Sequence, residues 1–167
     1  TFILSVHNQV NHYTESYCTD SNKAIYKNKI IELSEKTLAY VKNYCEDEAL
    51  FQTAFIKSAL INIISAYAHT LLYNKDFPKL KNVVKLIEDF NRILKFNENT
   101  PSYELSCKIK ADYWLFSTMR DIQASLTFYD RALKLLPNYH PIKPIILFNM
   151  GYCYYLKADK KNCVAYL

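Results

Sequence analysis

The sequence predicts an all-α fold of seven or eight helices, and three observations lead to this prediction. The chain of 167 residues contains one glycine and five prolines, too few for the tight turns and bulges of sheet-rich domains. Half of its residues are hydrophobic, which indicates a packed core rather than disorder. Apolar residues recur at helical spacing between short breaks that contain Asp, Asn or Pro. Connections this short favour helices that pack antiparallel to their neighbours in sequence.

The first part of the chain is expected to hold two long helices. In residues 22–45 one stripe of an amphipathic helix is formed by Ile30, Leu33, Leu38, Val41 and Tyr44. The acidic run at 46–49 suits the first turn of a second helix, because carboxylates stabilise the positive end of the helix dipole. This second helix is expected to extend to Tyr73. It is apolar on several sides, so we expect it to be packed between neighbours.

Two breaks divide the middle of the chain. At the first, Asp76 is placed to cap a helix and Pro78 falls near its first turn, where a missing N–H costs nothing. That helix is expected to run to about Phe96. The segment 97–102 then forms a loop, and its last residues, including Thr100, open the next helix.

The last third of the chain predicts a further helix, a linker and a final helix pair. After a short break, Asp121 is expected to cap an amphipathic helix. Residues 137–144 contain three prolines and are expected to form a linker. The last pair begins near Ile145 and turns at the sequence KAD, residues 157–159.

A repeat relates the later helices to one another. The segments 73–77, 118–122 and 156–160 each place a single Asp between an apolar helix and an amphipathic one. The segment DIQASLTFYDRALKLLPN, residues 121–138, resembles the second helix of a tetratricopeptide repeat. It has the small residues, the aromatic residue and the closing proline of that helix at Ser125, Ala132, Tyr129 and Pro137.

The segment 147–167 is similar to the first helix of the following repeat and the start of its second helix. Gly151, with Met150 before it, matches the Leu-Gly pair of the family, and Tyr154 and Cys163 match its Tyr and Ala. The only glycine of the chain is therefore expected where two helices cross closely, since a small residue lets their backbones approach. The resemblance implies a right-handed solenoid of antiparallel helix hairpins.

The resemblance covers residues 61–167, and residues 1–60 are expected to be a divergent helical part of the same single domain. The three turns are spaced by 45 and 38 residues, whereas the family repeats about every 34. Leu80 replaces a small residue, and Tyr113 falls on the glycine position unless Ala111 is shifted into it.

In this family the first helices of the repeats line a concave surface, and the resemblance implies which residues would line it here. An aromatic wall with one Lys and one His would suit a peptide with apolar anchors. Two alternatives stay open: that His69 is a packing residue, and that the final aromatic stripe packs against a further repeat. The predicted binding residues are His69, Tyr73, Lys110, Trp114, Phe148, Tyr152 and Tyr155.

The sequence predicts neither an enzyme nor a metal or cofactor site. It contains no HExxH, no Gly-rich phosphate loop and no GxSxG. The five cysteines form no CxxC pair, which favours reduced thiols in a cytoplasmic protein. Cys153 and Cys163 are expected to be small packing residues, with a redox pair as the alternative. The lysines that give the net charge of +5 are scattered, so nucleic-acid binding is not supported.

The expected function is a non-catalytic, cytoplasmic scaffold that binds a protein or peptide partner and no membrane. Two alternatives rest on the fold and on the ends of the sequence, which look like those of a piece of a longer chain. One is the sensor or oligomerisation domain of a bacterial transcriptional regulator, and a homo-oligomer is an alternative assembly of the chain. The other is the accessory helical domain of a larger enzyme.

Overall fold

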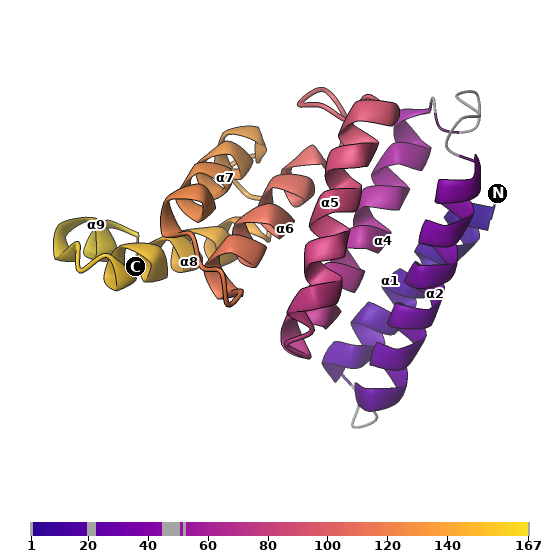
Figure 1. Ribbon diagram of the computed structural model, residues 1–167, viewed down its shortest axis with the longest axis horizontal. Coiled ribbons are helices and arrows are strands. Elements are labelled where there is room, and N and C mark those ends of the chain that lie inside the picture. The colour runs from indigo at the N-terminus through magenta and orange to yellow at the C-terminus, as the bar shows by residue number, and fades with distance from the viewer. Residues whose placement is uncertain (1, 20–22, 45–50, 52, 167) are drawn as a thin grey trace. The chain divides into compact units, whose positions relative to one another are not determined.

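The computed structural model describes residues 2–19, 23–44, 51 and 53–166, and over these residues it contains eight helices and no strand (Figure 1). The predicted all-α class and the predicted number of helices are therefore confirmed. The chain divides into two compact units, Thr1–Tyr103 and Glu104–Leu167, which we call unit 1 and unit 2.

Unit 1 contains four long helices: α1 (Phe2–Thr19), α2 (Lys23–Tyr44), α4 (Ala54–Tyr73) and α5 (Phe77–Ile93). Helix α4 packs against α1, α2 and α5, and α1 also packs along α2 (Figure 1). The expectation that the apolar helix ending at Tyr73 is surrounded by neighbours is confirmed. Its side chains Leu60, Ile63 and Leu71 are buried in the core of this unit.

Helix α4 is also the one helix among the described residues that is long and apolar enough to cross a membrane, by length and composition alone. The core helix of a soluble protein satisfies the same criterion. Of the most apolar stretch of this helix, 56% is buried inside the protein.

Local side chains fix where the helices of unit 1 begin and end. The hydroxyl of Thr53 accepts a hydrogen bond from the backbone N–H of Ile56 at 3.3 Å and so caps the start of α4. The predicted acidic first turn at 46–49 lies outside the described residues. Helix α5 ends at Ile93, three residues before the expected Phe96, because Lys95 adopts a left-handed conformation with φ 52°.

Unit 2 contains the remaining helices: α6 (Tyr103–Phe116, whose first residue belongs to unit 1), α7 (Ile122–Leu135), α8 (Lys143–Leu156) and α9 (Lys160–Ala165). Helix α8 packs against both α7 and α9. It begins two residues before the expected Ile145, because Pro144 is accommodated in the first turn, where no N–H is needed. Thr100 accepts a hydrogen bond from the N–H of Asn97 at 3.1 Å, so it closes the loop before α6 instead of capping that helix.

The turn between α4 and α5 closes with two backbone hydrogen bonds. The N–H of Asp76 donates to the carbonyl of Leu71 at 2.9 Å, and the N–H of Lys75 donates to that of Leu72 at 3.0 Å. Lys75 has φ 57°, so this is the Schellman arrangement of a helix C-terminus. The Asp76 carboxylate then accepts from the N–H of Lys79 at 3.2 Å. One residue thus ends α4 and caps α5.

The turn between α8 and α9 repeats this geometry. The N–H of Asp159 donates to the carbonyl of Tyr154 at 3.0 Å, and the N–H of Ala158 donates to that of Tyr155 at 2.9 Å. Ala158 has φ 56°, and the Asp159 carboxylate accepts from the N–H of Asn162 at 3.1 Å. Two turns that are distant in sequence therefore have the same backbone conformation and the same type of capping residue, an Asp.

The turn between α6 and α7 uses the same cap but is longer. Five residues separate these helices, whereas three residues separate the helices at each of the other two turns. The N–H of Asp121 donates to the carbonyl of Trp114 at 2.9 Å, and its carboxylate accepts from the N–H of Ala124 at 2.9 Å. Trp114 therefore takes the place that Leu71 and Tyr154 have in the other turns.

Small buried residues occupy the same place before each turn. Ala68, Ala111 and Gly151 each lie three residues before the carbonyl that accepts from the capping Asp. The hydroxyl of Ser125 on α7 donates to the carbonyl of Ala111 at 3.0 Å, which marks a close approach of α6 and α7. Because this turn is longer, Ala111, and not Tyr113, lies at the same distance before the accepting carbonyl as Ala68 and Gly151.

Candidate functional site

The predicted binding residues fall in both units, with His69 and Tyr73 on α4 of unit 1 and the other five on α6 and α8 of unit 2. His69 is exposed and interacts with a neighbouring group. The ring of Tyr73 lies 3.7 Å from the ammonium of Lys27 and meets the ring of Tyr17 edge to face, with centroids 6.1 Å apart. Tyr73 thereby joins α4 to α1 and α2, while its ring stays largely exposed.

In unit 2 the aromatic side chains of α8 stack with Phe116, which is not among the binding residues predicted from the sequence. Phe116, at the end of α6, lies 6.4 Å from Tyr152, and Tyr152 lies 6.3 Å from Tyr155 between ring centroids. Both ring pairs are 15° from parallel. Phe148 lies one helical turn before Tyr152 and is 63% exposed, and Tyr155 is 68% exposed. We call these four residues the aromatic face.

Lys110 and Trp114 have different neighbours. The ammonium of Lys110 lies 5.5 Å from the centroid of Phe128 on α7, and the ring of Trp114 packs edge to face against Tyr113 at 5.1 Å. On a helix, Trp114 projects about 200° away from Phe116, two residues further on. The structure therefore brings Phe116 together with Tyr152 and Tyr155, and it gives no ring contact between Trp114 and these tyrosines.

Unit 2 also contains a buried polar network formed by residues of α6, α7 and α8. The Asp112 carboxylate on α6 is 6% exposed, and it accepts hydrogen bonds from the Tyr129 hydroxyl and from the Lys108 ammonium, each at 2.5 Å. The Asn149 amide on α8 donates to the Tyr129 oxygen at 2.9 Å and to Asp112 at 3.4 Å. Three helices are joined by this network, because Tyr129 belongs to α7.

The protonation states and charges of this network suit a structural role. Burial raises the pKa of the Tyr129 phenol, and the neighbouring Asp112 carboxylate raises it further, so the hydroxyl remains a donor. The Lys108 ammonium balances the charge of Asp112. Every member of the network thus has a partner, as a low-dielectric interior requires.

In each of the turns after α6 and α8, the N–H of the capping Asp donates to one carbonyl, that of Trp114 or Tyr154. Lys108 and Asp112 lie six and two residues before Trp114, and Phe148 and Tyr152 lie six and two residues before Tyr154, so the two pairs hold corresponding positions. An alignment of the helices on the Asp residues themselves assigns Lys110 and Trp114 to these positions instead. The signal for Lys108 and Asp112 was their spacing of four, which puts opposite charges on one helical face.

The cysteines of unit 2 are free thiols. Cys153 is buried, and its sulfur lies 3.7 Å from the hydroxyl of Ser125, while Cys163 is half-buried. Burial raises the pKa of the Cys153 thiol, which disfavours the nucleophilic thiolate. The environment of Cys153 is that of a small packing residue.

Among the residues that the structure describes, no three His, Cys, Asp or Glu side chains lie close enough together to hold a metal ion. Comparison of the chain with protein-family models, with curated proteins and with solved structures found no match.

Proposed function

We propose that this chain is a non-catalytic helical scaffold, built of tetratricopeptide-like repeats, that binds a protein or peptide segment on the aromatic face of unit 2. The observation that carries this proposal is the near-parallel stack of Phe116, Tyr152 and Tyr155 beside the exposed Phe148. Contiguous aromatic side chains that face water are a common feature of protein-binding surfaces.

The energetics favour a partner with apolar anchors. Burying a large exposed apolar side chain contributes about 1.5–3 kcal/mol, and aromatic pairs in offset or edge-to-face contact add about 0.5–1.5 kcal/mol. The rings of Phe116, Tyr152 and Tyr155 already hold one another in place before a ligand arrives. Binding therefore costs less side-chain entropy than it would on a surface of isolated aromatic residues.

The buried network supports the same proposal, because it fixes the helices that carry the aromatic face. Asn149 follows Phe148 directly on α8, and its amide is hydrogen-bonded to Tyr129 of α7 and Asp112 of α6. A surface held in this way is preorganised. The recurring Asp-capped turns and the small residues before them support the repeat architecture in the proposal.

A displayed peptide library tests this function. Peptides selected on the full chain should bind the Phe148→Ala and Tyr152→Ala variants at least about tenfold more weakly, because each loses an aromatic anchor. The matched control is Tyr139→Ala, which removes a 99% exposed ring of unit 2 outside the aromatic face and should leave affinity unchanged.

Selection of no peptide, or equal binding by all of these variants, would contradict the proposal. Trp114→Ala in the same assay tests the assignment made from sequence. A loss as large as that of Tyr152→Ala would show that Trp114 also contributes to the binding surface.

A further inference from the structure

We infer that unit 1 carries a second docking surface, a groove between α2 and α5 that fits an acidic amphipathic helix of a partner protein. Both helices pack against α4, which lies between them (Figure 1). Two hollows of about 370 and 320 Å³ follow one another there, and they share Lys42, Asn82 and Leu86. They therefore form one continuous depression, which we call the α2–α5 groove.

The apolar lining of the groove has the spacing that a helical partner requires. On α5 it consists of Val83, Leu86, Phe90 and Ile93, which are separated by three, four and three residues. This is the a/d spacing with which one helix receives the side chains of another. Leu38 of α2 lies on the opposite wall.

The dimensions also suit a helix. The lining residues of α5 extend from Lys79 to Ile93, which corresponds to roughly 21 Å along a helix axis. A partner helix of about four turns would cover this length. Leu86 is half-buried and Ile93 is 38% exposed, so apolar surface remains available to a ligand above the buried Val83 and Phe90.

The charges along the groove determine what kind of helix fits. Its lining contains the cations Lys42, Lys79, Lys85 and Arg92, but only two carboxylates, Glu35 and Asp89. A partner with acidic residues beside its apolar stripe is therefore complementary to the groove.

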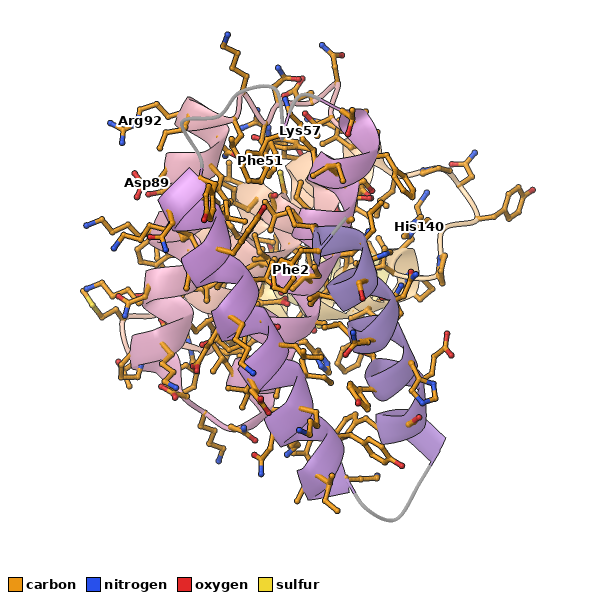
Figure 2. The ribbon with its side chains drawn as sticks, turned by 90° about the vertical axis from the view of Figure 1, so that its right-hand side faces the viewer. Phe2, Phe51, Lys57, Asp89, Arg92 and His140 are labelled. Carbon is orange, nitrogen blue, oxygen red and sulfur yellow. The ribbon has the colours of Figure 1, made fainter. Side chains whose placement is uncertain are left out.

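Both carboxylates of the groove already have partners. Lys79 donates to Glu35 at 2.8 Å, and Tyr67 donates to the same carboxylate at 2.9 Å. Arg92 donates to Asp89 at 3.2 Å, and Figure 2 shows both of these side chains at the outer side of α5. A second copy of the chain would present the same excess of cations, so a groove-to-groove dimer is electrostatically disfavoured.

A designed peptide tests the inference. The probe is a fluorescent helical peptide of about 15 residues with leucines at a/d spacing and glutamates beside them, and its control has lysines in place of the glutamates. We expect the acidic peptide to bind the full chain more tightly than the control, and its affinity to fall with added salt. Fluorescence anisotropy measures both affinities.

Matched variants locate the binding. Leu86→Glu should weaken the acidic peptide at least about tenfold, because it places a carboxylate on the apolar floor, and Lys85→Glu should weaken it about three- to tenfold. The controls Ile25→Glu and Lys36→Glu change exposed residues of α2 outside the groove and should bind like the wild type.

Equal binding of the two peptides, or no effect of Leu86→Glu, would overturn the inference. Sedimentation velocity tests the alternative that a second copy of the chain fills the groove. A dimer of the full chain that becomes monomeric with Leu86→Glu would show that a second copy, not an acidic helix, fills the groove. The aromatic face is tested separately, since Tyr152→Ala should leave binding of the designed peptide unchanged.

Discussion

The hydroxyl of Tyr129 on α7 donates a hydrogen bond to the carboxylate of Asp112 on α6, and both groups are buried. The carboxylate oxygen that accepts this bond is Asp112 Oδ1, whose other hydrogen bond comes from the Asn149 amide at 3.4 Å, while Lys108 donates to the second oxygen, Oδ2. The pair therefore connects two helices through a hydrogen bond that depends on the hydroxyl oxygen of Tyr129.

Removing that atom should destabilise the protein. We expect Tyr129→Phe to lower the free energy of unfolding by about 1–3 kcal/mol, because it leaves a buried carboxylate oxygen with one long hydrogen bond. Urea unfolding followed by circular dichroism measures the change. The matched control, Tyr139→Phe, removes the hydroxyl of an exposed tyrosine and should be neutral. Equal stability of the two variants would show that the pair does not stabilise the fold.

Glycine at the left-handed position of two turns should stabilise the protein. Lys75 and Ala158 both have positive φ, a conformation that costs a non-glycine residue on the order of 1 kcal/mol. We expect Lys75→Gly and Ala158→Gly each to raise the unfolding free energy by up to about that amount. Lys81→Gly, within α5, should lower it by about 1 kcal/mol. A loss of stability in all three variants would contradict the assigned turn conformation.

Low pH should lower the stability of unit 1, because it protonates the carboxylate of Glu35. The hydrogen bond from Lys79 lowers the pKa of the Glu35 carboxyl below its ordinary value of 4.5, and the bond from Tyr67 acts in the same direction against the effect of burial. A carboxyl with a lowered pKa contributes stability above its unfolded value, and that contribution is lost as the pH falls through the folded pKa. The affected range therefore lies below pH 4.5.

The measurement is the thermal midpoint as a function of pH. We expect Glu35→Gln to be less stable than the wild type at neutral pH and to lose less stability on acidification. Tyr67→Phe retains the Lys79 contact and should show a smaller change in the same direction. If the wild type and Glu35→Gln have parallel pH profiles, Glu35 does not contribute to the pH dependence.

The three cysteines of unit 2 should react with an alkylating reagent in an order set by their burial. Cys163 is half-buried, whereas Cys107 and Cys153 are buried and the pKa of Cys153 is raised. Because the thiolate is the reactive form, brief treatment of the native protein with a maleimide should modify Cys163 before Cys107 and Cys153. Peptide mass spectrometry identifies the sites, and unfolding in urea should equalise the rates. Preferential labelling of Cys153 in the native protein would contradict its described environment.

The turns could be predicted from sequence because their chemistry is local. Asp76, Asp121 and Asp159 each bind a backbone N–H three residues away, which one sequence is enough to suggest. The register of α6 was harder to predict. The turn after Phe116 is two residues longer than the other two turns, so each residue of α6 lies two residues further from its capping Asp than the corresponding residue of α4 or α8. An alignment on Asp121 therefore assigns Trp114 to the position that Asp112 holds in the structure.

The network and the groove could not be predicted from sequence for a different reason. Tyr129 and Asn149 are 17 and 37 residues from Asp112, and no periodicity of a single chain indicates which polar residues meet across helices. The α2–α5 groove likewise depends on helices that are separated by the whole of α4. Predicting either feature requires the packing of the helices as well as their boundaries.

The Asp residue that ends one helix and caps the next has a consequence for how the protein opens. At Asp76 and Asp159 a single residue donates its N–H to one of the last carbonyls of one helix and accepts, through its carboxylate, from one of the first N–H groups of the next. Neither helix of such a hairpin can fray at the turn without releasing a hydrogen bond of the other. We therefore expect each hairpin to exchange its amide hydrogens as one cooperative segment, with the first openings in the loops that separate hairpins, at residues 97–102 and 137–142.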